Sequence, residues 1–260
     1  MNPITVARLL FSFLGCFNII NAASIPSNAA LIPSNGRSVE GVNVDIREYP
    51  YQVALLYSSS PICAGSILNR KWVLTAAHCL SRSNFLLRYS VRAGSNYRNT
   101  GGVSVPVVST RTHSRYNSGS LDYDIGVAWL QSELTYGSSI RPVELPLPND
   151  YIRPRTTATT TGWEDDVSGS HLRGVSVQII DNDVCQDSYY DSRVITDNMI
   201  CAGFASSNTC QGESGEPLVA SEYGQLGIAS WGNDCGRAGP YGVYTRVSAF
   251  RTWINSQTGV

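Results

Sequence analysis

Short runs of alternating or β-branched residues, separated by turn clusters, constrain the fold of this chain more than any other feature. Such runs occupy 51–56, 71–74, 103–108 and 174–180. Clusters rich in Ser, Pro, Gly and Asn interrupt the chain at 58–61, 99–102 and 168–170. Alternation is typical of strands with one buried face, and regular breaks favour an all-β fold over alternating helices and strands.

The C-terminal end is the main exception to this strand pattern. Phe250, Trp253 and Ile254 recur at helical spacing and form one apolar stripe. This spacing predicts a helix over 247–256. The total length of 260 residues allows one large domain or two small ones, and no internal repeat is present.

The N-terminal segment has the pattern of an export signal. Arg8 precedes an apolar stretch over 9–20, and the small residues Ala22, Ala23 and Ser24 follow. We therefore expect a signal peptide over 1–23 and a pro-segment over 24–37, which lacks an apolar period. A buried N-terminal helix is the alternative. The apolar stretch is too short to span a membrane comfortably, and no later one is long enough.

Composition excludes some classes of function. A formal net charge of -1 argues against nucleic-acid binding, and 42% hydrophobic with 15% charged residues is typical of a globular protein. No Cys/His cluster has zinc-site spacing, so we expect no metal and no cofactor.

Apart from Cys16 in the signal, an even number of cysteines remains, which indicates disulfides and an oxidising, extracellular compartment. They are Cys63, Cys79, Cys185, Cys201, Cys210 and Cys235. Counting alone leaves every pairing open.

Three strings supply a base, a carboxylate and a nucleophile. They are Leu-Thr-Ala-Ala-His-Cys ending at Cys79, Asp-Tyr-Asp-Ile-Gly-Val from Asp122, and Gly-Glu-Ser-Gly-Glu-Pro around Ser214. A serine hydroxyl attacks well only when an imidazole takes its proton and a buried carboxylate orients that imidazole. His78 and Asp124 offer these groups. Asp122 is a rival carboxylate, whereas His113 and His171 lack such a context.

In this order, 46 and 90 residues apart, the strings resemble the trypsin/chymotrypsin family of serine proteases. The resemblance is to an invertebrate chymotrypsin-like member. It implies two six-stranded antiparallel β-barrels with the active site between them, a C-terminal helix, and a protease domain over 38–260 with its junction near 142–154. It also implies an oxyanion hole formed by Gly212 and Ser214. The implied bridges are Cys63–Cys79, Cys185–Cys201 and Cys210–Cys235.

The same resemblance gives an expectation about specificity. Asn208 stands six residues before the serine, where trypsins have an Asp that binds Lys or Arg. An uncharged Asn would leave a buried cation without its partner. Gly232 and Gly242 match the glycines that keep the pocket open, and Ser230, Trp231 and Gly232 match the strand that pairs with substrate. We expect cleavage after large neutral residues, while Asn208 is also compatible with a polar preference.

Several residues depart from the family pattern. Ser38 replaces the usual Ile after the activation site at Arg37, and Glu213 replaces the Asp that pairs with the freed amino group. Ser38 lacks an aliphatic side chain to bury, at a cost of roughly 1.5–3 kcal/mol. Glu216 replaces a glycine and is expected to occupy a backbone position that needs glycine torsions. Glu164 replaces another glycine.

Two classes of function therefore remain. One is a secreted serine endopeptidase of the gut lumen or of a venom, a monomer activated by a trypsin-like protease. Its partners would be protein or peptide substrates and protein inhibitors, without nucleic acid or membrane. The other is a serine-protease homologue that acts as a binding or regulatory secreted protein. The complete triad favours the enzyme, and the altered activation residues favour the homologue.

Overall fold

A computed structural model describes six stretches of the chain. They are residues 41–81, 88–163, 171–190, 193–203, 214–232 and 241–260. The expected signal peptide and pro-segment lie outside these residues.

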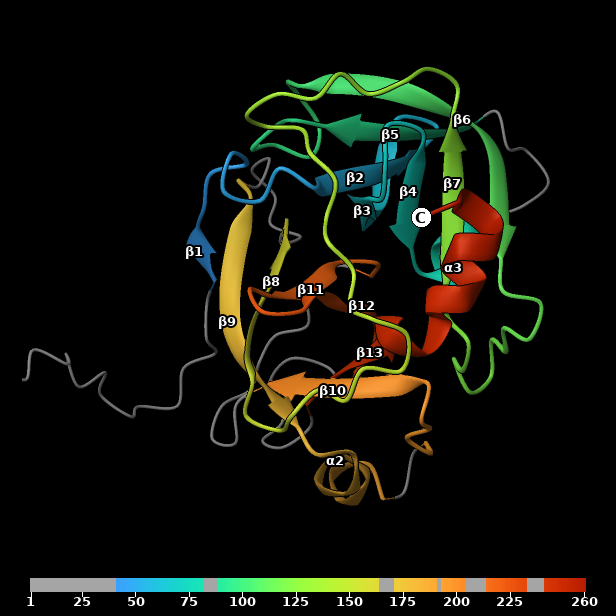
Figure 1. Ribbon diagram of the computed structural model, residues 1–260. Helices are drawn as coiled ribbons and strands as arrows, with labels where there is room; N and C mark the ends of the chain where they lie inside the picture. Colours follow the sequence, from blue (N-terminus) through green and yellow to red (C-terminus); the bar gives the residue numbers. More distant parts are fainter. Residues whose placement is uncertain (1–40, 82–87, 164–170, 191–192, 204–213, 233–240) are drawn as a thin grey trace, which may run out of the picture. The chain divides into compact units, whose positions relative to one another are not determined.

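The first half of the described chain forms a closed antiparallel barrel (Figure 1). Its strands follow the spatial order β2-β3-β4-β7-β6-β5. The bounds are β2 Gln52–Tyr57, β3 Ser60–Ile67, β4 Trp72–Thr75, β5 Tyr89–Ala93, β6 Val103–Thr112 and β7 Gly126–Leu130. The turn expected at 58–61 is shorter than predicted: Ser58 and Ser59, with positive φ angles of 50° and 67°, close the β2–β3 hairpin, and Ser60 already begins β3.

The second half forms another closed antiparallel barrel. Its order is β9-β10-β13-β12-β11-β8, and pairing of β8 with β9 completes the circle. The bounds are β8 Thr157–Gly162, β9 Arg173–Ile180, β10 Met199–Gly203, β11 Pro217–Ala220, β12 Gly224–Trp231 and β13 Gly242–Arg246. The short strand β1 (Val42–Asn43) adds to β9. The all-β prediction of two six-stranded barrels is confirmed.

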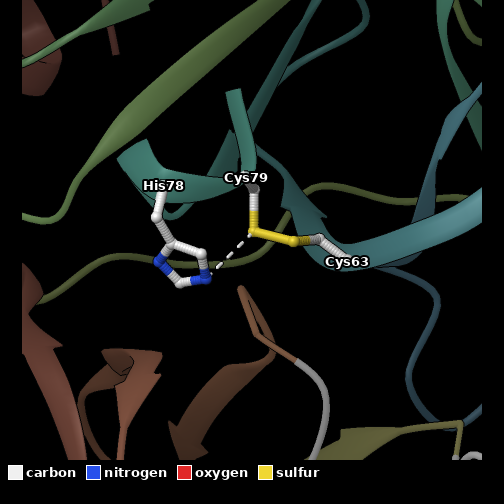
Figure 2. A group of neighbouring side chains, drawn as sticks. All are labelled: Cys63, His78 and Cys79. Atoms are coloured by element: carbon white, nitrogen blue, oxygen red, sulfur yellow. Dashed lines mark hydrogen bonds between the residues drawn. A yellow bond between two sulfur atoms is a disulfide. The ribbon is translucent and has the colours of Figure 1, made fainter. Parts of the chain in front are cut away.

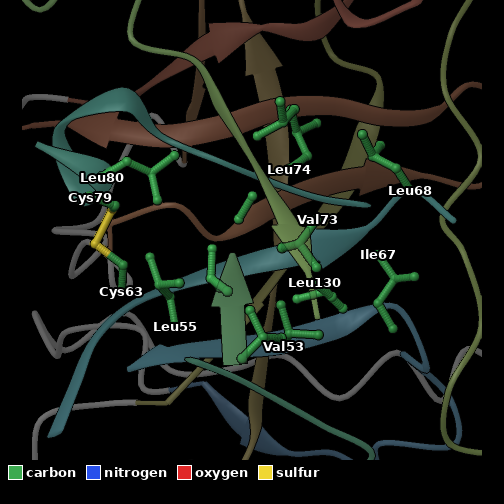
Figure 3. Packing of buried hydrophobic residues seen from close by; sticks show 14 of the residues in the cluster. Val53, Leu55, Cys63, Ile67, Leu68, Val73, Leu74, Cys79, Leu80 and Leu130 are labelled. Carbon is green, nitrogen blue, oxygen red and sulfur yellow. A yellow bond between two sulfur atoms is a disulfide. The ribbon is translucent and has the colours of Figure 1, made fainter. Parts of the chain in front are cut away.

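Inward-facing aliphatic side chains fill the first barrel (Figure 3). Val53, Leu55, Ile67, Val73 and Leu130 are fully buried there and come from four strands. Val53 and Leu55 alternate along β2, as expected when successive side chains point to opposite faces, and the residue between them is buried as well. Burial of each such side chain stabilises the fold by roughly 1.5–3 kcal/mol.

Buried polar side chains join the two barrels. Ser66 Oγ on β3 donates to Gln225 Oε1 on β12 at 2.6 Å. Thr161 Oγ1 on β8 donates to Gln52 Oε1 on β2 at 2.8 Å. Because a buried amide needs partners, these bonds fix how the barrels meet. Residues 131–156 run from the end of β7 to the start of β8.

Within the described residues, helices are few and short. They are α1 (Ala77–Leu80), α2 (Asn182–Ser188), the 3-10 helix η2 (Val247–Phe250) and α3 (Arg251–Thr258). The expected C-terminal helix is confirmed, with Ile254 fully buried against the first barrel. No helix in the described stretches has the length and apolarity needed to cross a membrane.

His113 joins the C-terminal helix to the loop before β7. Its ring stacks on Tyr123 with centroids 4.8 Å apart and lies 5.4 Å from Phe250 and 5.5 Å from Trp253. Burial, and secondly the nearby Arg115, lower the pKa of His113 below its ordinary value. The folded protein therefore disfavours the protonated imidazole.

Replacing His113 by Phe is expected to reduce the loss of stability in mild acid. Below the ordinary pKa of 6.5 the unfolded chain binds a proton that the folded chain resists, so stability falls as pH falls. Phe keeps the ring contacts and cannot titrate. Urea unfolding at about pH 7.5 and 5.5 measures the effect, since these values bracket the ordinary pKa. An unchanged difference between the two pH values would contradict this explanation.

Candidate active site

The candidate base lies on a single helical turn stapled by a disulfide. Helix α1 follows β4 directly and carries His78 and Cys79. Cys79 is bonded to Cys63 on β3, so the turn is tied to the barrel wall (Figure 2). The side chain of His78 is 26% exposed, which leaves one side of the imidazole open.

The candidate carboxylate is completely buried. Asp124 has no exposed surface, and its Oδ2 accepts a hydrogen bond from Nδ1 of His78 at 2.7 Å. Its Oδ1 accepts from the backbone N–H of His78 at 2.9 Å. Because Nδ1 carries the proton in this pair, Nε2 of the neutral imidazole is an acceptor.

Two residues of the second barrel complete the surroundings of Asp124. Ser230 Oγ on β12 donates to Asp124 Oδ2 at 2.6 Å. Thr245 Oγ1 on β13 donates to the backbone carbonyl of Asp124 at 2.7 Å. A buried carboxylate needs several donors to offset lost hydration, and Ser230 supplies one of them. The Thr245 bond instead fixes the backbone that carries Asp124.

Sequence reasoning assigned Ser230 to substrate pairing and missed its bond to Asp124. Thr245 was missed altogether. Both are hydroxyl residues inside strands with mainly apolar neighbours, and both are buried. That pattern could have indicated them, since buried hydroxyls need partners.

The candidate nucleophile stands in a turn held by both barrels. The carbonyl of Ser214 accepts from the backbone N–H of Ala64 on β3 at 2.9 Å, and Gly215 N–H donates to Ala229 on β12 at 2.8 Å. Gly215 has φ of 85°, and a Cβ there would lie 2.3 Å from the Ala64 carbonyl oxygen. Glycine is therefore required immediately after Ser214.

A chain of bonds through the Cys63–Cys79 disulfide connects the Ser214 turn to the turn that carries His78. Ser214 is bonded to Ala64, the neighbour of Cys63, and Cys63 is bonded to Cys79. Cys79 Sγ lies 3.6 Å from His78 Nε2. The serine turn and the helical turn that carries His78 are therefore both attached to neighbouring residues of β3, Ala64 and Cys63.

The expectation that Glu216 needs glycine torsions is wrong. Glu216 is absent from the non-glycine residues with positive φ. Its side chain is buried and lies over Gly162, where an added Cβ would come within 1.4 Å of Oε1. Thr160 Oγ1 donates to Glu216 Oε2 at 3.3 Å. The extra carboxyl is therefore accommodated because Gly162 leaves room for it.

The expected substrate strand ends beside two glycines. Trp231 is 8% exposed, and its ring meets Tyr189 at 4.8 Å and the guanidinium of Arg193 at 5.3 Å. Gly232 follows β12 and Gly242 begins β13, and both are half-buried.

Several expected site residues lie outside the described residues. They are Arg37, Ser38, Glu164, Asn208, Cys210, Gly212, Glu213 and Cys235. Of the expected bridges, Cys63–Cys79 and Cys185–Cys201 are formed.

The cluster of Cys63, His78 and Cys79 brings three potential metal ligands within 4.8 Å of one another. Both sulfurs belong to one disulfide (Figure 2), and metals bind the thiolate form of cysteine. The cluster therefore does not suit a metal ion.

The architecture is that of a serine hydrolase. The buried Asp124, the imidazole of His78 and the Ser214 turn are held by strands from both barrels. Comparison with known proteins gives the family. The family model described as Trypsin matches residues 38–254. The chain is 39% identical over 242 residues to "Trypsin alpha-4" of Lucilia cuprina, covering 90% of this chain and 92% of the relative.

Other relatives agree. "Trypsin 5G1" of Aedes aegypti is 35% identical over 234 residues, which cover 87% of each chain. "Transmembrane protease serine 11E" of Mus musculus is 34% identical over 246 residues, which cover 90% of this chain and 57% of that protein. The chain belongs to the trypsin family and is a serine endopeptidase.

Proposed function

We propose that this endopeptidase cleaves proteins with a triad of Ser214, His78 and Asp124. The observation that carries the proposal is the buried Asp124 carboxylate, which accepts the Nδ1 proton of His78 and is held by Ser230. We assign Nε2 of His78 as the base that takes the proton of Ser214.

The chemistry follows from these roles. Ser214 Oγ attacks the carbonyl carbon of the scissile bond while its proton passes to His78 Nε2. The C–N bond then breaks, and the departing amine takes that proton, which leaves an acyl-enzyme. A water molecule gives its proton to Nε2 and attacks the ester, and Ser214 recovers the proton as the acid leaves. Asp124 stabilises the imidazolium at each stage.

The negative charge on the carbonyl oxygen needs donors already in place. We assign the backbone N–H groups of Gly212 and Ser214 to this oxyanion hole, as the family pattern implies. The bonds of Ser214 to Ala64 and of Gly215 to Ala229 support the assignment, because they restrain the turn that presents the serine N–H.

Large neutral residues are the proposed side chains before the cut bond. Asn208 supplies no charge to the pocket, and Gly232 and Gly242 leave its walls open. The names of the relatives favour a second candidate, cleavage after Lys or Arg. In that case Asp234, beside Cys235, would be the source of the missing charge.

Peptide substrates distinguish the two specificities. We expect substrates ending in Phe, Tyr or Leu to be cleaved at least about tenfold faster, by kcat/KM, than those ending in Arg or Lys, because an unpaired buried cation is costly. Asn208→Asp should narrow that ratio, and Asn208→Ser is the neutral control. Faster cleavage after Arg by the unmodified enzyme would overturn the assignment, and its loss in Asp234→Asn would identify the alternative charge.

Activation is proposed to occur by cleavage after Arg37 by a trypsin-like protease. The new amino group of Ser38 would then pair with Glu213. The accommodation of Glu216 in the second barrel removes one argument for an inactive homologue. That alternative, a binding or regulatory protein, still rests on Ser38 and Glu213. The N-terminal sequence of the processed protein should begin Ser-Val-Glu.

The export pattern at the N-terminus supports secretion, with the gut lumen or a venom as candidate compartments. Disulfides such as Cys185–Cys201 fit an oxidising environment. We propose a monomer that acts on proteins and is controlled by protein inhibitors.

A further inference from the structure

A groove on the outer face of the first barrel combines aromatic rings with cations. It has a volume of about 590 Å³. We call it the Trp groove, and its lining residues are Asn69, Arg70, Lys71, Trp72, Arg111, Trp129, Glu133 and Tyr136. With three cations and one acid, it is positively charged in a chain whose formal net charge is -1.

Strand pairing builds the aromatic part of the groove. Trp72 on β4 lies directly opposite Trp129 on β7, and the two rings stack with centroids 5.8 Å apart. Arg111 on β6 places its guanidinium 5.4 Å from the Trp72 ring. Trp72 is therefore in contact with both Trp129 and Arg111, whereas Trp129 remains 42% exposed. One broad apolar face is available to a ligand.

The cations are held by uncharged partners. Arg70 donates to the carbonyl of Leu134 at 3.0 Å and lies 4.1 Å from the Tyr136 ring. Lys71 Nζ donates to the carbonyl of Gln131 at 3.0 Å. Arg111 donates to Gln257 on α3 at 3.2 Å.

Across the described part of the chain, none of these three cations forms an ion pair with a carboxylate. Their charges are thus positioned by carbonyls and rings, and they remain available to an external anion.

We propose that the Trp groove binds a linear sulfated polysaccharide. Sulfate oxygens accept hydrogen bonds from guanidinium and ammonium groups spaced along the groove, and a sugar ring offers an apolar face to Trp129. The proposal concerns binding alone and does not depend on the triad, so its failure would leave the proposed catalytic function untouched.

The sheet disfavours an acidic peptide as the ligand. β4 is paired with β3 and β7, and β7 with β4 and β6, so the closed barrel offers no free strand edge here. A peptide would keep its backbone groups without a ladder partner. A single-stranded nucleic acid is disfavoured because successive bases need several open aromatic faces, and Trp129 offers one.

Heparin is the probe for the test, with the full-length chain in solution and binding measured by calorimetry at several salt concentrations. Arg70→Gln combined with Arg111→Gln should weaken the affinity by about tenfold or more and flatten its salt dependence. Trp129→Ala should also weaken it, by about threefold to tenfold, at unchanged charge.

Arg153→Gln combined with Arg155→Asn is the matched control, because it removes two exposed charges from the segment just before β8, away from the Trp groove. Asn suits position 155, where φ is 69°. This control should change the affinity by no more than about twofold. An equal loss in the control and groove variants, or no heparin binding at all, would overturn the proposal. Tighter groove-dependent binding of polyglutamate or of a single-stranded oligonucleotide would also overturn it, since the ligand would then be of another class.

Discussion

Replacing Ser214 by alanine is expected to lower kcat by about 10⁶-fold, because the acyl-enzyme cannot form without the hydroxyl. The bond that the structure gives Ser214 runs from its backbone carbonyl to Ala64 N–H, and alanine retains it. The fold should therefore be unchanged. Steady-state hydrolysis of the best peptide substrate measures the loss, with thermal unfolding as the check on folding.

Ser221→Ala is the matched control for this substitution. Ser221 is exposed in the turn between β11 and β12, beyond the end of β11 from Ser214, and its loss should leave kcat unchanged. If Ser214→Ala kept more than about a hundredth of the activity, another group would have to be the nucleophile.

Replacing Asp124 by asparagine should lower kcat by about 10⁴-fold at neutral pH, the size of loss known for this mechanism. The carboxylate now accepts from His78 Nδ1 and from Ser230, and it is fully buried. An amide cannot accept from all of these donors, and its NH₂ group facing Nδ1 would favour the wrong tautomer of the imidazole.

The rival carboxylate Asp122 provides the control. Its Oδ1 accepts from Thr196 at 3.1 Å and from Asn198 at 2.9 Å, so it joins the loop before β7 to the second barrel. Asp122→Asn should change kcat by less than about tenfold, since Asp122 makes structural contacts and does not touch His78. A large loss for Asp122→Asn with normal turnover for Asp124→Asn would reverse the assignment.

The strand pattern predicted the fold because short alternating or β-branched runs between turn clusters are typical of strands packed against a core. The runs at 51–56 and 174–180 correspond closely to β2 and β9. Helix α2 was missed because its seven residues are mostly polar and lack an apolar stripe. Its N-terminal signal was present, since Asp181 accepts from the N–H of Asp183.

The sequence predicted the base and its carboxylate but not the residues that hold the carboxylate in place. Local strings identify His78 and Asp124, because the base and its carboxylate stand next to distinctive neighbours. The partners Ser230 and Thr245 come from strands more than a hundred residues away, and no local pattern shows which residues meet across two barrels. Glu216 was misjudged for a related reason, since the space beside Gly162 that receives its side chain depends on the packing of β8.

Covalent labelling tests the central claim most directly. The protein cleaved after Arg37 is treated with a fluorophosphonate, which reacts with a serine only when a base and an oxyanion hole activate it. The account predicts one adduct per molecule, located on Ser214 by peptide mass spectrometry, and none in Asp124→Asn over the same period. A correctly cleaved, folded protein that stays unlabelled, or that is labelled at another serine, would contradict it.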